Sequence, residues 1–87
     1  MVRIWARIIK GEKIINETIF ESFEPFNVDN FFDYISCICE TLNIATPVIL
    51  NKHIFHYLSF NLATFLPQDF PEEIDFDKFI IEEASNY

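Results

Sequence analysis

Lys52, His53 and His56 bring one ammonium donor and two imidazoles into a five-residue segment, and imidazole is the side chain whose ordinary pKa lies nearest to neutral pH. The two histidines lie three positions apart, so on a helix their imidazoles would be neighbours on one face and could begin a zinc site. Zinc needs further ligands, and Cys37 and Cys39 would point to different sides of a helix because each residue turns about 100°. We therefore treat these three residues as a candidate interaction site, with partly exposed or hydrogen-bonded histidines as the alternative.

The two cysteines are weak candidates for a nucleophile. A reactive thiolate needs an electropositive setting, whereas the segment around Cys37 is acidic, and Cys39 falls among apolar residues that predict a buried position. The chain also lacks a G-x-S-x-G elbow, a P-loop and an H-E-x-x-H motif. We expect no catalytic residue, no metal and no cofactor, and thus no enzyme. Because the cysteines are too close for a loop-closing disulfide, we expect a reducing, cytoplasmic location.

The last part of the chain is strongly acidic. Its carboxylates face a single cation, Lys78, and the whole chain carries a net charge of −8. This charge argues against direct binding to nucleic acid or to anionic membranes. Calcium would need a glycine at the sharp turn of an EF-hand-type loop, and the segment has none. A row of carboxylates could instead imitate nucleic-acid phosphates and inhibit a basic protein, which is our alternative functional hypothesis. The residues of this possible acidic face are Asp69, Glu72, Glu73, Asp75, Asp77, Glu82 and Glu83.

Aromatic residues dominate the apolar composition. A chain of 87 residues with eleven Phe predicts one compact domain over residues 1–87. Its single Gly excludes a glycine-rich phosphate loop. Most of the Phe residues should fill an ordinary core, and a sticky partner-binding surface is the alternative. No apolar run is long enough to predict a membrane span. Small size favours self-association as a source of further burial.

Alternation of apolar residues predicts a hairpin at the start of the chain. Residues 2–9 place Val2, Ile4, Ala6 and Ile8 on one face of a strand, and a turn over 10–13 leads into a second strand over 14–23. A helix should follow, with Asn27 as its N-cap and Asn43 at its end. Its apolar stripe consists of Val28, Phe31, Phe32, Ile35, Ile38, Cys39 and Leu42.

The second half predicts shorter elements. We expect a short strand over 48–50, a helix over 52–58 capped by Asn51, a strand over 60–65 ended by Pro67, and a strand over 75–84. Glu82 and Glu83 suggest that this last strand lies at a sheet edge, where charge discourages pairing. The fold class is therefore α+β, with a small, mostly antiparallel sheet packed against one main helix.

Several turn and core motifs resemble those of short uncharacterised proteins of clostridial-type bacteria. They are Ala45-Thr46-Pro47-Val48-Ile49-Leu50-Asn51-Lys52-His53-Ile54, Phe65-Leu66-Pro67-Gln68-Asp69-Phe70 and Asp75-Phe76-Asp77-Lys78. The resemblance implies a compact, cytoplasmic, bacterial protein and transfers no functional residue. Together these observations predict a small non-catalytic protein-interaction or accessory module, binding another protein or a second copy of itself.

Overall fold

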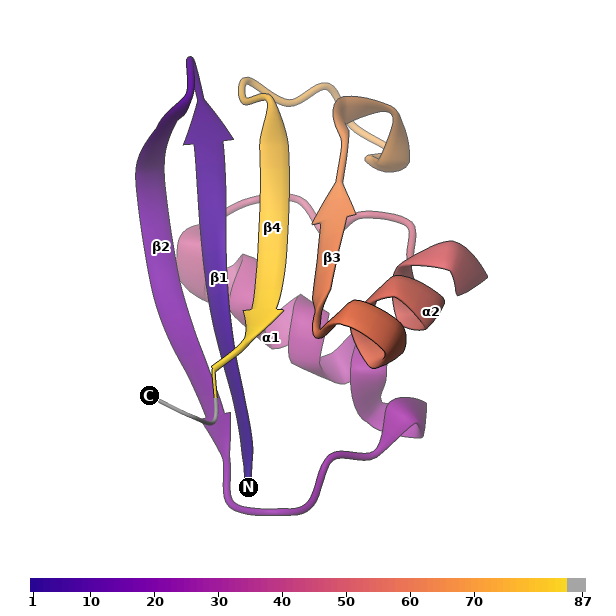
Figure 1. Cartoon of the computed structure of the whole chain (residues 1–87). Helices are drawn as coiled ribbons and strands as arrows, with labels where there is room; N and C mark the ends of the chain where they lie inside the picture. Colours follow the sequence, from indigo (N-terminus) through magenta and orange to yellow (C-terminus); the bar gives the residue numbers. More distant parts are fainter. Residues whose placement is uncertain (85–87) are drawn as a thin grey trace.

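Four antiparallel strands and two α-helices build the protein, as the computed structural model of residues 1–84 shows (Figure 1). The strands are β1 (Val2–Lys10), β2 (Lys13–Ser22), β3 (Leu62–Phe65) and β4 (Lys78–Glu83), in the order β2-β1-β4-β3 across the sheet. The helices are α1 (Phe31–Leu42) and α2 (Asn51–Phe60), with short 3-10 turns η1 (Val28–Asn30) and η2 (Pro67–Asp69). The predicted α+β class and N-terminal hairpin are confirmed. Residues 85–87 of the predicted domain lie outside the described residues.

The hairpin closes through a two-residue turn. Gly11 and Glu12 both have positive φ, at 59° and 66°, and lie between the paired residues Lys10 and Lys13. Positive φ at both central positions defines a type I′ turn, whose twist matches that of the flanking strands. The loop before β4 holds this turn, because the Gly11 N–H donates to Asp77 Oδ2 at 2.8 Å. The last strand is thus fixed to the first hairpin at its tip.

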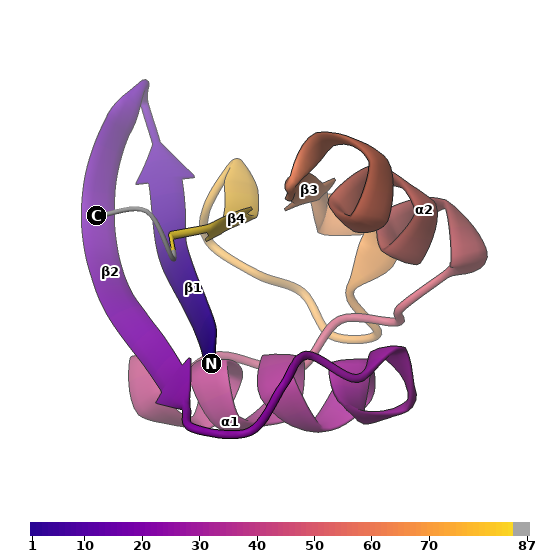
Figure 2. The same ribbon diagram turned by 60° about the horizontal axis from the view of Figure 1, so that its bottom comes forward.

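Helix α1 covers one face of the sheet (Figure 2). Asn27 caps η1 by accepting the Asp29 N–H at 2.9 Å, and the α-helix itself begins at Phe31. Asn43 ends α1 with a left-handed φ of 58°, as predicted. Val28 and Phe32 are 41% and 58% exposed, so their predicted places on the apolar stripe are wrong. The buried residues of α1 are Phe31, Tyr34, Ile35, Ile38, Cys39 and Leu42.

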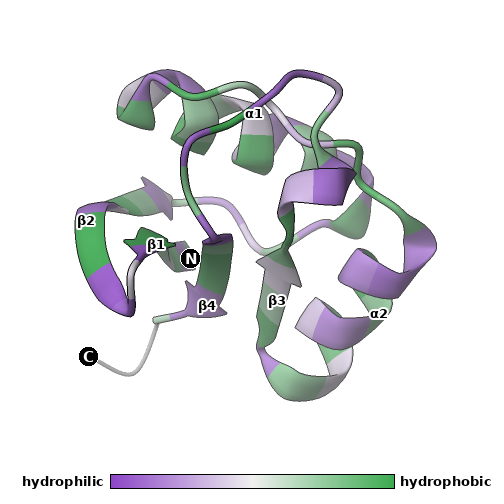
Figure 3. Cartoon of the chain, turned by 90° about the horizontal axis from the view of Figure 1, so that it is seen from above, coloured by the Kyte–Doolittle hydropathy of each residue, from purple (hydrophilic) through white to green (hydrophobic). Residues whose placement is uncertain are grey.

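Helix α1 packs against the alternating face of β1 that the sequence predicts. Val2, Ile4, Ala6 and Ile8 are all at most 4% exposed. In the views from below and from above, α1 lies across this side of the sheet and α2 lies beside β3 (Figures 2 and 3). Among the described residues, no helix lies against the opposite face of the sheet.

Polar contacts organise that open face. The Trp5 Nε1–H donates to Glu17 Oε1 at 2.9 Å, and the Arg7 guanidinium carbon lies 3.9 Å from the centroid of the Trp5 ring. Arg7 also binds Glu82 across the β1–β4 pair, with 3.0 Å between Nη1 and Oε1. Opposite charges on neighbouring strands therefore stabilise the pairing of β4 with β1.

Two predictions for the second half are wrong. Residues 48–50 form no strand, because this extended segment runs past η2 and makes a single backbone bond to it, from the Val48 N–H to the Asp69 C=O at 2.7 Å. The last strand is not at an edge either, since β4 pairs with β1 on one side and with β3 on the other. Its carboxylate Glu82 is accommodated in the interior of the sheet because Arg7 binds it.

Element bounds differ in smaller ways. Helix α2 begins at Asn51, so its N-cap is Leu50 and the predicted cap at Asn51 is wrong. The helix continues two residues beyond the predicted Leu58 and ends where Asn61 adopts a left-handed φ of 58°. Strand β3 therefore begins at Leu62 instead of residue 60. Strand β4 begins at Lys78. Just before it, the Asp77 N–H donates to the Ile9 C=O at 2.8 Å, and the side chains of Asp75 and Asp77 bind Lys10 and the Gly11 N–H.

The turn residues Gly11 and Glu12 give a matched test of this hairpin. Gly11→Ala should lower the free energy of unfolding by about 1 kcal/mol, because a Cβ at this φ is strained even though nothing lies within 4 Å of it. Glu12→Gly relieves the same strain at the next residue and should leave the protein at least as stable. Urea unfolding of both variants measures this, and a Gly11→Ala protein as stable as the wild type would contradict the type I′ turn.

Candidate functional site

A groove between α2 and β3 contains the three residues singled out in the sequence. Its cavity volume is about 520 Å³, and Lys52, His53 and His56 all line it. One wall comes from α2 and the other from β3 and the residues that follow it. Its remaining lining residues are Phe60, Leu62, Ala63, Thr64, Leu66 and Asp69.

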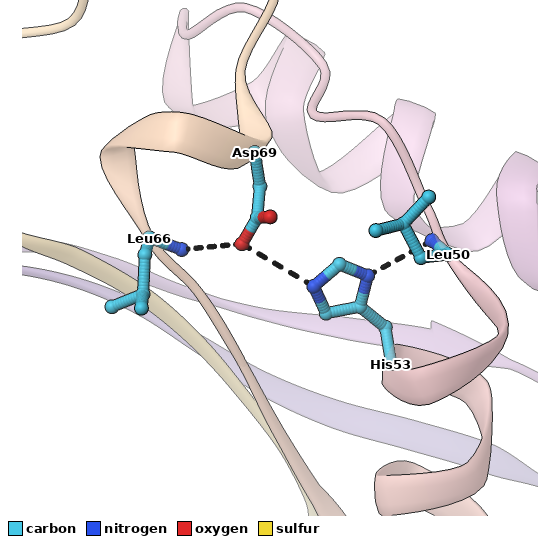
Figure 4. A network of polar contacts seen from close by, with 4 residues as sticks. All are labelled: Leu50, His53, Leu66 and Asp69. Atoms are coloured by element: carbon cyan, nitrogen blue, oxygen red, sulfur yellow. Dashed lines mark hydrogen bonds and ion pairs between the residues drawn. The ribbon is translucent and has the colours of Figure 1, made fainter.

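His53 is buried in this groove and fully engaged (Figure 4). It is 1% exposed, and its ring lies 4.3 Å from the ring of Phe65, centroid to centroid. The backbone N–H of Leu50 donates to His53 Nδ1 at 2.9 Å. On the opposite side of the ring, Nε2 lies 3.3 Å from Asp69 Oδ2. Both ring nitrogens therefore have a partner within the protein.

These partners determine the protonation of the imidazole. An N–H can only donate, so Nδ1 must carry a lone pair toward Leu50, and Nε2 must carry the proton that it donates to Asp69. Burial lowers the pKa of His53 below its ordinary value of 6.5, while the neighbouring Asp69 carboxylate opposes this shift. His53 is thus a neutral imidazole with the proton on Nε2.

The arrangement resembles the carboxylate–imidazole half of a catalytic triad, with one decisive difference. A general base needs a free nitrogen facing the reacting group. In this protein, the nitrogen opposite the carboxylate accepts a backbone N–H from Leu50 instead. The geometry therefore gives His53 a structural role and leaves it no nitrogen for proton transfer or metal binding.

Asp69 is the residue of this site whose contact with His53 the sequence did not predict. Its Oδ2 accepts the Leu66 N–H at 2.9 Å as well as the His53 proton, and its side chain is 6% exposed. Its backbone C=O accepts the Val48 N–H. Asp69 thereby ties three segments together: the start of α2, the end of β3 and the extended chain before α2. We call the His53–Asp69 pair with its two backbone donors the latch.

The latch separates His53 from the other two candidates. Lys52 and His56 are exposed and lie one helical turn apart on the groove wall. The His56 ring lies 6.1 Å from the ring of Phe55 and 6.0 Å from that of Phe60. Lys52 and His56 are thus accessible to a ligand in the groove, whereas the ring nitrogens of His53 are not.

The cysteines and metal-ligating residues form no second site among residues 1–84. Cys37 is exposed and Cys39 is buried, and burial raises the pKa of the Cys39 thiol to about 12. A thiol of this kind remains protonated and unreactive. In the described part of the chain, no three His, Cys, Asp or Glu residues come close enough to hold a metal ion.

The predicted acidic face is largely engaged within the protein. Asp69 belongs to the latch, Asp75 accepts a bond from Lys10, Asp77 accepts the Gly11 N–H, and Glu82 binds Arg7. Glu83 is half-buried, whereas Glu72 and Glu73 are exposed in the loop before β4. Most of these carboxylates already have partners, so they do not form the basis of the function proposed below.

Comparisons with known proteins add no assignment. No family model, no curated protein and no solved structure matches this chain. Within residues 1–84, neither helix has the length and apolar character needed to cross a membrane. The functional argument therefore depends on the geometry of the protein itself.

The neutral state of His53 predicts a loss of stability in mild acid. As the pH falls through 6.5, His53 of the unfolded chain binds a proton that the folded protein excludes, so unfolding becomes more favourable. Below that value, the free energy of unfolding should fall by at most about 1.4 kcal/mol per pH unit, until the pH passes the lowered pKa of folded His53. Urea unfolding across this pH range measures the loss.

Two variants identify the group responsible for this acid dependence. His53→Gln removes the ionisable group, so the free energy of unfolding of this variant should no longer include the loss in acid that His53 causes. His56→Gln retains His53 and should retain the acid dependence. An equal acid dependence in the wild type and in His53→Gln would show that folding does not lower the pKa of His53.

Proposed function

We propose that this protein is a small, non-catalytic protein-interaction module whose main binding surface is the α2–β3 groove. The observation that carries this proposal is the combination of an open groove with a latch in which both ring nitrogens of the buried His53 are hydrogen-bonded. Such a site can bind a ligand and orient it, and its buried histidine, His53, has no nitrogen available for proton transfer.

Exposed aromatic residues support an interaction role. Five of the eleven Phe residues are exposed, so the Phe content is divided between core and surface. Phe55 and Phe60 on α2 are 62% and 68% exposed. Both rings lie beside the exposed His56 ring, at centroid distances of 6.1 Å and 6.0 Å, and contiguous exposed apolar surface marks protein-binding sites. The exposed Phe residues are Phe23, Phe26, Phe32, Phe55 and Phe60.

A second apolar groove lies between the start of α1 and the extended segment before α2. Its volume is about 540 Å³, and its lining includes Phe32 and Val48, which are 58% and 51% exposed. This groove has no cationic lining residue and no edge strand. The α2–β3 groove combines both features with apolar walls, which makes it the better candidate for specific recognition.

The proposal predicts a partner that depends on Phe60. The tagged protein should retain a specific protein from an extract of its host, or a second copy of itself, at about 0.1 M and about 1 M salt, because apolar burial is not screened. Phe60→Ser should abolish retention. Phe23→Ser is the matched control, since Phe23 is 91% exposed and lines neither groove.

Light scattering after size exclusion separates self-association from binding of another protein. A wild-type dimer that becomes a monomer in Phe60→Ser would identify the partner as a second copy. If wild type and Phe60→Ser are both monomeric and retain the same proteins, the groove is not a binding surface and the proposal is wrong.

A further inference from the structure

The backbone of β3 presents unused hydrogen-bonding groups to the α2–β3 groove. Because the Glu83 N–H donates to the Asn61 C=O at 2.8 Å, alternate residues from Asn61 onward direct their backbone groups toward β4. The intervening residues Leu62 and Thr64 must then direct their N–H and C=O groups away from β4. Helix α2 lies on that side of β3 (Figure 1).

The latch uses the next outward position of the same edge. The Leu66 N–H also points away from β4, and it donates to Asp69 Oδ2. Within residues 1–84, no hydrogen bond from another segment reaches the outward groups of Leu62 and Thr64. Asp69 thus accepts the outward N–H at the Leu66 end of this edge, and the outward backbone groups of Leu62 and Thr64 remain available to a ligand.

Helix α2 forms a wall about as long as the four-residue strand β3. Lys52, His56 and Phe60 lie four residues apart and therefore form one stripe along the groove. The stripe is about 12 Å long at 1.5 Å per residue, which equals about four residues of extended chain. The groove can thus hold a short extended segment between a strand edge and a helix.

The other edge of the sheet is protected against the same kind of pairing. The Ala84 N–H donates to the Arg3 C=O, so Arg3 and Arg7 direct their backbone groups to β4. Their partners on β2, Glu21 and Glu17, consequently direct their backbone groups away from β1, and both of these residues are charged. A register shift also interrupts the β1–β2 pair between Ile8 and Ile9. Charges and bulges are the usual means of blocking an edge strand. Strand β3 carries neither in its outward residues.

Charge in the groove indicates the chemistry of the ligand. Arg3, Arg7 and Lys10 each bind a carboxylate of this protein. Lys52 forms no ion pair with any described residue and stands at the Leu66 end of the groove. An extended ligand would therefore be complementary if it carried a carboxylate at that end and an apolar side chain near Phe60.

We propose that the α2–β3 groove binds an extended peptide segment of a partner protein, which adds as a strand to β3 and places a carboxylate beside Lys52. This inference rests on the proposed function and specifies its ligand. Backbone bonds to Leu62 and Thr64 supply the pairing, as in other cases of strand addition, and the α2 wall selects the side chains. The carboxylate is either an Asp or Glu side chain or the C-terminus of the segment.

Selection from a library of random peptides tests the inference without a known partner. The probes are peptides of about seven residues, displayed once with a free C-terminus and once with a blocked one. Peptides enriched on the wild-type protein should share a carboxylate followed or preceded by an apolar residue. Enrichment that requires the free terminus identifies an α-carboxylate, and enrichment in both libraries identifies an acidic side chain.

Three variants then test the binding mode with the enriched peptide. Thr64→Pro removes the outward N–H without touching the β4 ladder, and it should weaken binding about tenfold. Thr64→Val keeps the N–H and the shape of the side chain, so it should bind about as well as the wild type. Lys52→Glu, an exposed change that keeps the fold testable if Thr64→Pro does not fold, should weaken binding by at least a similar factor.

Two outcomes would overturn the inference. One is a wild-type protein that enriches no peptide from either library. The other is an enriched peptide that binds Thr64→Pro or Lys52→Glu as tightly as it binds the wild type. If a protein partner is still retained in a Phe60-dependent manner, the proposed function stands and only strand addition fails.

Discussion

The buried pair of His53 and Asp69 is the interaction on which the geometry of this protein depends. A buried carboxylate is costly unless its oxygens accept hydrogen bonds, and Asp69 accepts them from His53 and from the Leu66 backbone. The same pair fixes the first turn of α2, through Leu50, against the end of β3. Without this pair, the described residues would have no side-chain hydrogen bond between the start of α2 and the end of β3.

The sheet supplies the second constraint. Strand β4 lies between β1 and β3, and its loop binds the hairpin turn through Asp77, so the last strand joins both halves of the fold. This topology makes β2 and β3 the two edges. Glu17 and Glu21 protect the first, whereas α2 shelters the second without covering its outward backbone groups. The chemistry of the groove therefore follows from strand order as much as from side chains.

Local patterns in the sequence predicted the local structure well. Alternation in β1, the lone glycine in its turn and the helix end at Asn43 all act within a few residues, and each was found as expected. Asn27 is a cap as well, but of η1, and α1 begins three residues later than that cap implied. The central place of β4 could not be predicted, because Glu82 is an unfavourable interior residue until Arg7 of β1 is known to bind it. Likewise, Lys52, His53 and His56 were found together, but Asp69 is 16 residues from His53 and no spacing rule connects them.

The central claim is that His53 is a neutral structural imidazole, and its ring nitrogens can be observed directly. A long-range proton–nitrogen correlation spectrum, recorded at about pH 7, distinguishes protonated from unprotonated ring nitrogens. We predict a proton on Nε2 and a lone pair on Nδ1 of His53. A proton on Nδ1, or on both nitrogens, would contradict the latch and with it the structural role assigned to this residue.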